Sequence, residues 1–178
     1  VNNLLIPDTQ QGMFVTAVYA VLYPKSGKMV YANAGHNPPL WLTSDGKIER
    51  LTRTSMALGV VEDTIIEERT IKLKKDDNLL LYTDGLSEAF SPDGDLLQKE
   101  RIIAVLQARG SESAEKILGD IEDELDEFVG DVEADAQTLL FGLFALDLVE
   151  GCEEIAHIVC GDANSVILHS DVDPLGFY

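Results

Sequence analysis

The segment from Phe14 to Pro24, FVTAVYAVLYP, combines β-branched and aromatic residues in one run and stops at a Pro-Lys-Ser-Gly turn. The segment that follows, KMVYANAGH, has the same character. Phe14–Tyr23 and Lys28–Ala32 are therefore predicted to form a β-hairpin through Gly27. PPLWLTSDGKIERLT predicts a second hairpin, because the Asp-Gly of its Ser44-Asp45-Gly46 turn is a strong hairpin signal. TIIEERTIKL and NLLLYTD add two further strands.

The hydrophobic period then changes from that of strands to that of helices. Gln98 to Arg109 has helical spacing and stops at Gly110, and Ser111 to Val129 has one apolar stripe along a second helix. QTLLFGLFALDL, Gln137 to Leu148, predicts a buried strand. Strands, then helices, then a strand indicate an α+β fold in which antiparallel sheets are packed against helices. The stripe of the second helix consists of Ile117, Leu118, Ile121, Leu125 and Phe128.

The end of the chain contains two short strand-like runs. Ile155–Cys160 and Ser165–His169 lie on either side of Gly161-Asp162-Ala163-Asn164, which has the composition of a turn. We expect a further hairpin here. We expect residues 1–148 to form the main domain and 149–178 to be a C-terminal extension packed on it.

Composition limits the class of protein. The chain has 178 residues, of which 46% are hydrophobic, enough for one globular domain with a core. It has no apolar run of about 18 residues that would predict a membrane span, and its first residues do not have the pattern of a signal peptide. Cys152 and Cys160 fit neither a disulfide framework nor a zinc site. A cytoplasmic protein is the simplest interpretation.

The charge balance is strongly acidic, with 13 basic and 32 acidic residues and a net charge of -19. Such a surface repels nucleic-acid phosphates and anionic lipids, so neither is expected as a partner. It favours divalent cations or a basic partner. The acidic residues opposite the stripe of the second helix are interpreted as a solvated face rather than a metal site.

Three short motifs carry candidate functional residues. Asp84 follows the apolar run of NLLLYTDGLSEAF, and Gly85 comes after it; the pair is either a turn or a carboxylate held at the end of a buried strand as a metal ligand. In NAGHNPPL, His36 is a candidate ligand or base, but a histidine that holds the loop by hydrogen bonds is the preferred interpretation. In EADAQTLL, Asp135 precedes the late strand and would lie beside Asp84 if the two strands are neighbours.

The order of these motifs resembles a known family. MFVTAVYAVLYPKSGKMVYANAGHNPPLWL, MALGV, NLLLYTDGLSEAF and DAQTLLFGLFAL follow one another as in the SpoIIE/RsbU-type branch of the PPM (PP2C-like) protein phosphatases. The usual forms in that family are Ala-Gly-His-Asn-Pro-Pro, Tyr-Thr-Asp-Gly and Asp-Asp-Ile-Thr. The resemblance covers roughly residues 1 to 147.

The resemblance implies a fold, a metal and a reaction. The fold is an αββα sandwich of two antiparallel sheets flanked by helices, with two Mn²⁺ or Mg²⁺ ions in a cleft at one end. Asp84 and Asp135 match aspartates that are metal ligands in the family, and His36 and Gly85 belong to loops at the site. Hard oxygen ligands suit these ions. Two such metal ions, roughly 3.5–4 Å from each other, activate a water molecule for in-line attack on a phosphoserine or phosphothreonine ester. No nucleophilic Cys or Ser is then needed.

The family also suggests a partner. The resemblance implies that the substrate is a phosphorylated STAS-domain anti-sigma-factor antagonist and that the protein acts in bacterial signalling. It also implies an attached sensor or regulatory domain in the full-length protein.

The chain departs from the family pattern at several positions. The family begins with strands carrying a Gly-Asp-Val-Ser-Gly-His-Gly type motif that supplies further metal ligands, and the chain starts after it. The second aspartate of the late motif is Ala136, and the glycine of a Pro-Gly-Asp turn is Asp76. These departures leave open a second hypothesis, a catalytically inactive phosphatase-like domain that binds partners. A third, a metal-buffering acidic domain, rests on charge alone.

Overall fold

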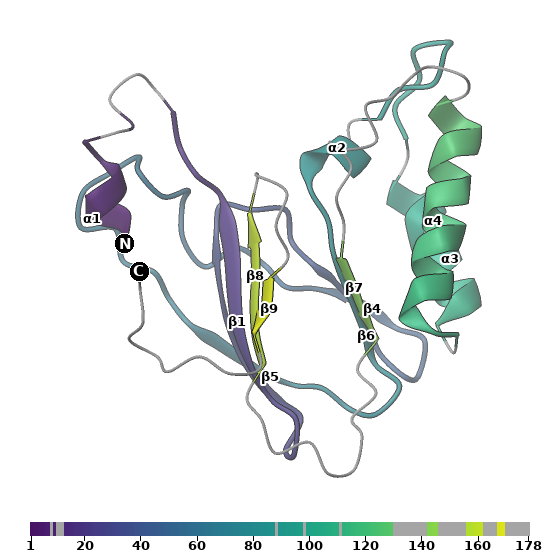
Figure 1. Ribbon diagram of the computed structural model, residues 1–178, viewed down its shortest axis with the longest axis horizontal. Coiled ribbons are helices and arrows are strands. Elements are labelled where there is room, and N and C mark those ends of the chain that lie inside the picture. The colour runs from purple at the N-terminus through teal and green to yellow at the C-terminus, as the bar shows by residue number, and fades with distance from the viewer. Residues whose placement is uncertain are drawn as a thin grey trace. The chain divides into compact units, whose positions relative to one another are not determined.

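The computed structural model describes residues 1–7, 9, 13–87, 89–97, 99–110, 112–129, 142–145, 156–161 and 167–169. The chain divides into two units. Unit 1 comprises Val1–His36, Thr52–Leu73 and Leu148–Tyr178, and unit 2 comprises Asn37–Leu51 and Lys74–Asp147. Each unit contains one antiparallel sheet (Figure 1).

The sheet of unit 1 has five strands in the order β5-β2-β1-β8-β9. The long strand β1 lies in the middle and pairs with β2 on one side and with β8 on the other. Along β1 the side chains of Val18, Ala20 and Leu22 are buried and those between them are more exposed, which is the alternation of a strand with one face on a core. The strands are β1 Ala17–Tyr23, β2 Lys28–Ala34, β5 Arg69–Lys72, β8 Ala156–Gly161 and β9 Ile167–His169.

The first predicted hairpin is confirmed. β1 and β2 pair from Ala17↔Ala34 to Tyr23↔Lys28, and Gly27 takes a positive φ of 68° in the turn. The prediction placed the start of the first strand too early, at Phe14. The chain leaves the ladder before Ala17, because Val15 forms an isolated bridge with Leu58.

The hairpin expected at the end of the chain corresponds to β8 and β9. They pair antiparallel from His157↔His169 to Val159↔Ile167. β8 in turn pairs with β1 from Ala17↔Gly161 to Leu22↔Ala156. The late residues therefore complete the sheet that the first hairpin begins.

A single helical turn, α1 Asn2–Leu5, is fastened to the loop before β5 in unit 1. The Nδ2 atom of Asn2 donates to the carbonyl of Val61 at 2.8 Å, and the amide of Gly59 donates to Oδ1 of Asn2 at 2.9 Å. Both ends of one buried side-chain amide are thus used to hold the loop.

The sheet of unit 2 has four strands in the order β4-β3-β6-β7. The predicted Ser44-Asp45-Gly46 hairpin is confirmed, since β3 and β4 pair antiparallel and Gly46 has a φ of 83°. All four residues of β6 are buried, and β6 pairs with β3 on one side and β7 on the other. The strands are β3 Leu40–Leu42, β4 Ile48–Arg50, β6 Asn78–Leu81 and β7 Gly142–Ala145.

Two helices, α3 Lys99–Arg109 and α4 Ala114–Val129, form the rest of the core of unit 2. They lie side by side (Figure 1) and share one hydrophobic cluster with β3 and β6. The prediction began the second helix at Ser111. The helix begins later because Ser113 caps it, with Oγ accepting from the amide of Lys116 at 3.4 Å. The most buried members of the cluster are Leu80, Leu106, Ile117 and Ile121.

These elements confirm the α+β fold class with two antiparallel sheets and helices. No helix in the described part of the chain is long and apolar enough to cross a membrane.

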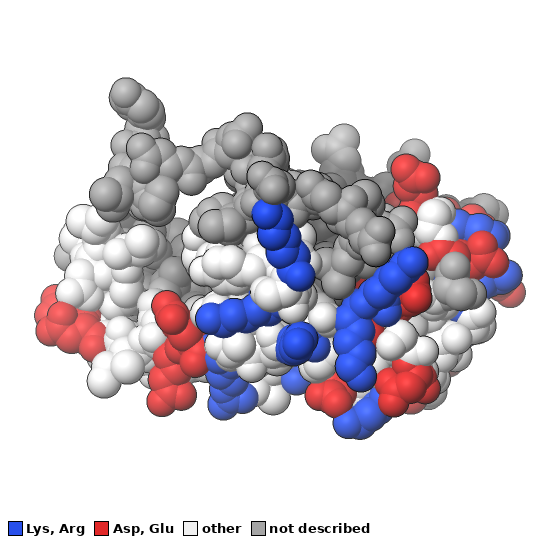
Figure 2. Space-filling model, turned by 90° about the horizontal axis from the view of Figure 1, so that it is seen from below, with Lys and Arg blue, Asp and Glu red and all other residues white. Residues whose placement is uncertain are grey.

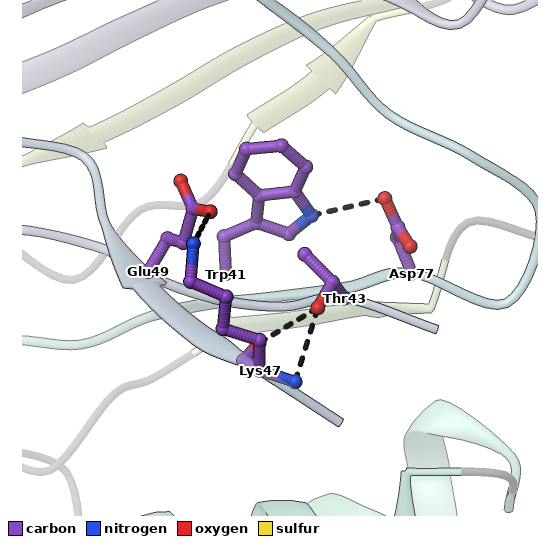
Figure 3. A network of polar contacts seen from close by, with 5 residues as sticks. All are labelled: Trp41, Thr43, Lys47, Glu49 and Asp77. Carbon is purple, nitrogen blue, oxygen red and sulfur yellow. Dashed lines mark hydrogen bonds and ion pairs between the residues drawn. The ribbon is translucent and has the colours of Figure 1, made fainter. Parts of the chain in front are cut away.

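The turn that leads into β6 is held by one buried carboxylate (Figure 3). Asp77 is 1% exposed. Its Oδ2 accepts from Nε1 of Trp41 at 3.0 Å and from the amide of Lys74 at 2.8 Å, and its Oδ1 accepts from the amide of Ser44 at 2.7 Å. A buried charge is tolerated when each oxygen is hydrogen-bonded, so this network fixes β6 against the β3–β4 hairpin.

Asp77→Ala should lower the free energy of unfolding by about 2–4 kcal/mol, because three donors lose their acceptor. Trp41→Phe removes one of these bonds and should cost roughly 1–2 kcal/mol. Urea denaturation followed by circular dichroism gives both values. A loss below about 0.5 kcal/mol for Asp77→Ala would contradict a structural role for the network.

Asp76, where the family has a glycine, lies in the left-handed region with a φ of 66°. Asp76→Gly should raise the free energy of unfolding by roughly 0.5–1 kcal/mol, because a side chain is strained at this φ. Lys75→Gly is the matched control. Lys75 is exposed in the same turn and has no positive φ, so its replacement should lower stability by a similar amount.

Candidate functional site

Asp84 lies immediately beyond the buried strand of unit 2. β6 ends at Leu81, Tyr82 and Thr83 are buried, and Asp84 is exposed as the first residue of the short helix α2, Asp84–Ser87. Leu86 in the same turn is 3% exposed and anchors it in the core. The carboxylate is therefore carried by a short segment that the buried residues Thr83 and Leu86 hold on either side.

The interpretation of Thr-Asp-Gly as a β-turn is wrong. In a turn Gly85 would take a positive φ, but it is helical and is not among the glycines with that conformation. Helical φ and ψ angles at Asp84 and Gly85 direct the chain away from the strand within one turn. The exposed carboxylate thus marks a strand-to-helix junction.

Thr83 has an unusual environment. Its side chain is 7% exposed, and its Oγ1 has no hydrogen-bond partner among the residues that the structure describes. A buried hydroxyl without a partner costs about 1–3 kcal/mol. Thr83 belongs to the Tyr-Thr-Asp-Gly motif, but the sequence alone gives it no role, because only burial distinguishes it from a solvated threonine.

The strands that carry the two candidate aspartates are neighbours. β6 and β7 pair antiparallel from Leu81↔Gly142 to Asn78↔Ala145. The end of β6, which leads to Asp84, is therefore beside the start of β7, which Asp135 precedes in the sequence. The condition set by the sequence, that these strands be adjacent, is met. Asp135 itself lies outside the described residues.

His36 is a buried residue of the loop after β2, in unit 1. It is 2% exposed, and its Nδ1 shares a hydrogen bond of 2.8 Å with Oγ1 of Thr16. Its amide donates to Oδ1 of the buried Asn33 at 2.9 Å, and its carbonyl accepts from Nε of Arg53 at 3.0 Å. Side chain and backbone of His36 both hold the loop in shape. The sequence did not single out Thr16 or Asn33.

Gly35 makes this loop possible. It has a φ of 72°, and a Cβ added to it would lie 2.7 Å from the amide nitrogen of Ala57. Its amide donates to the carbonyl of Ser55 at 3.1 Å. Only glycine permits both this backbone conformation and this close approach.

Two surface residues of the turn between β3 and β4 have shifted pKa values. A hydrogen bond with the Thr43 side chain lowers the pKa of Asp45. The hydrogen bond between Lys47 and Glu49, drawn in Figure 3, raises the pKa of Lys47. Both groups are on the surface. These shifts describe solvated turn contacts and do not indicate a second site.

The acidic charge is not spread uniformly. Figure 2 shows a face on which several Lys and Arg side chains lie among Asp and Glu side chains. All basic residues of the chain fall between Lys25 and Lys116, so the sequence after Lys116 carries only negative charge.

The donor set at the end of β6 fits a hard divalent cation. Asp84 offers an exposed carboxylate, a ligand type that such ions prefer, and the adjacent Thr83 has a buried hydroxyl with no partner among the described residues, which could hydrogen-bond to a ligand. Within the described ranges no group of three or more His, Cys, Asp or Glu side chains is placed to hold a metal ion. Asp84 therefore remains a candidate ligand, and the described residues alone do not form a complete metal site.

Comparison with known families identifies the chain. A sequence model of the family described as Stage II sporulation protein E (SpoIIE) matches residues 1–142. The chain belongs to this SpoIIE family. The resemblance drawn from the ordered motifs is therefore confirmed. The matched residues include the Tyr-Thr-Asp-Gly segment that contains Asp84.

Two curated relatives match the chain in part. Protein IcfG of Synechocystis sp. is 32% identical over 125 residues, which are 70% of this chain and 19% of IcfG. Phosphoserine phosphatase RsbP of Bacillus subtilis is 31% identical over 120 residues, which are 60% of this chain and 29% of RsbP. The chain thus spans less than a third of the length of either relative.

A solved structure supports the fold. The phosphatase domain of SpoIIE from Bacillus subtilis, presoaked with Mn, superposes with a TM-score of 0.55 at 12% identity, over 72% of this chain and 55% of that one. At this identity the likeness concerns the fold alone, and it agrees with the two antiparallel sheets described above.

Gly35→Ala should destabilise the chain by roughly 3 kcal/mol, because the new Cβ meets both an unfavourable φ and the backbone of Ala57. Gly46→Ala is the matched control. Gly46 has a φ of 83° but nothing within 4 Å of an added Cβ, so it should cost only about 1–2 kcal/mol. Equal losses in chemical denaturation would show that the close approach at Gly35 does not matter.

Proposed function

We propose that the protein is a metal-dependent protein serine/threonine phosphatase that uses Mn²⁺ or Mg²⁺ to hydrolyse phosphoserine or phosphothreonine. One observation carries the proposal. The antiparallel register of β6 and β7 puts the end of β6, which leads to Asp84, beside the start of β7, and this supports an Asp135 carboxylate near that end of the sheet. Two carboxylates at one end of a rigid sheet are a suitable start for a divalent-metal site.

The relatives support this assignment. RsbP is named a phosphoserine phosphatase, and the SpoIIE domain with the same fold was presoaked with Mn. Two ions are expected from the family.

Each residue of this chain has a proposed part. The carboxylates of Asp84 and Asp135 hold the metal. When bound, the ions supply Lewis-acid stabilisation of the phosphoryl oxygens and an activated water. Gly85, without a side chain, leaves room beside Asp84 for a phosphorylated side chain. His36 shapes its loop through the bonds to Thr16 and Asn33 and takes no proton in the reaction.

We propose a phosphorylated protein as substrate, with a STAS-domain anti-sigma-factor antagonist as the specific partner. Signalling by dephosphorylation of such a protein would take place in the cytoplasm of a bacterium, under control of an attached sensor or regulatory domain. Residues 149–178 would serve as a structural extension of the 1–148 domain, since β8 pairs with β1.

The competing function is a phosphatase-like domain that binds partners without catalysis. Ala136 favours it, since the family has a second aspartate at this position. The two functions differ in whether the protein binds divalent metal, which the following experiment measures.

Calorimetric titration of the intact protein should show Mn²⁺ binding, and hydrolysis of p-nitrophenyl phosphate should require Mn²⁺. Asp84→Asn and Asp135→Asn should each weaken Mn²⁺ binding by roughly 100-fold or more and abolish hydrolysis, because each removes a carboxylate ligand.

Asp93→Asn is the matched control, since it removes an equal charge from an exposed acid in another loop of unit 2. It should leave both measurements unchanged. Absence of Mn²⁺ binding at millimolar concentration in the unaltered protein would reject the enzyme and favour the partner-binding domain. Binding that survives Asp84→Asn would place the metal elsewhere.

A further inference from the structure

The hydroxyl of Thr83 is an unused hydrogen-bond donor beside the candidate metal ligand. It is buried, it has no partner within the described part of the chain, and its residue directly precedes Asp84. Buried polar groups are nearly always paired, so an unpaired one calls for a reason. A group that meets its partner only when a ligand binds is one such reason.

Capping of α2 does not supply the partner. Thr83 stands where a helix N-cap stands, and a capping threonine would accept from a backbone amide in the first turn. No such bond is formed with the described residues, among which Oγ1 has no partner. Solvent water does not supply the partner either, since the side chain is only 7% exposed.

The chemistry of a metal site does supply a partner. Ligand carboxylates hold an ion through one oxygen and commonly accept a hydrogen bond on the other, which orients the ligand and tightens the site. A threonine hydroxyl rotates freely to donate to such an oxygen. Its position on the fixed backbone between β6 and α2 would keep the donor in place before the ion arrives.

We propose that Thr83 is a positioning residue for the metal: its hydroxyl donates to a carboxylate oxygen in the ligand shell of the ion that Asp84 holds. This inference rests on the proposed function. It assigns to Thr83 a part in metal affinity and none in the stability of the metal-free protein.

Thr83→Val tests this assignment because valine keeps the shape of threonine and removes only the hydroxyl. In the intact protein, calorimetry should show Mn²⁺ binding about 10- to 100-fold weaker than in the unaltered protein. The Tm of the metal-free variant should equal or exceed that of the unaltered protein, since a buried unpaired hydroxyl is gone. Thr83→Ser restores the donor and should bring Mn²⁺ affinity back to within about threefold.

The two readouts separate the possible failures. Mn²⁺ binding by the unaltered protein with unchanged affinity in Thr83→Val would overturn the inference and leave the proposed phosphatase intact. A lowered Tm of the metal-free Thr83→Val protein would also overturn it, because the hydroxyl would then be part of the fold. No Mn²⁺ binding by the unaltered protein would reject both proposals together.

Discussion

Complete burial of β6 is the constraint from which the candidate site follows. Asn78–Leu81 pair with β3 on one side and β7 on the other, and the side chains of Leu79, Leu80 and Leu81 are each 2% exposed or less. A strand enclosed on both edges and both faces has no freedom to shift register. The first exposed residue after this enclosure is Asp84, so the packing of the apolar strand fixes the backbone from which its carboxylate projects.

The same strand connects the site to the rest of unit 2. At its other end Asp77 fastens the entering turn to the β3–β4 hairpin through Trp41 and Ser44. Leu80 lies in the cluster formed with α3 and α4. Stability and site geometry are therefore coupled, since a change that loosens the Asp77 turn or the helices acts on the strand that carries Asp84. In unit 1, the loop that contains His36 is held by separate contacts. Gly35 permits its backbone conformation, and the side chain of Asn33 accepts a hydrogen bond from the amide of His36.

Much of this arrangement follows from local sequence signals. The Asp-Gly hairpin, the first hairpin through Gly27 and the helix ending at Arg109 are set by turn chemistry and hydrophobic period. The early start given to the first strand failed because Val15 pairs with Leu58, a contact distant in sequence. The helical state of Asp84 and Gly85 was missed because Thr-Asp-Gly alone favours a turn, whereas burial of Leu86 selects the helix.

Among the candidate site residues, too, some carry a local sequence signal and others do not. Asp84 was chosen as a candidate because its carboxylate follows an apolar run, and the resemblance to the family suggested its role as a metal ligand. Thr83 gave no such signal, because a buried hydroxyl without a partner is a property of packing. The adjacency of β6 and β7 was stated only as a condition, since strand order is a long-range property that no local pattern contains.

The order in which strands of unit 1 leave the ribosome has a consequence for synthesis. β1 and β2 are made early and can close at once, but the partner on the other edge of β1 is β8, which begins at Ala156. At translation rates of about 5–20 residues per second, that edge stays open for roughly ten seconds. An unpaired edge of seven residues invites pairing with another nascent chain. Association between nascent chains is therefore expected in the interval before β8 is made.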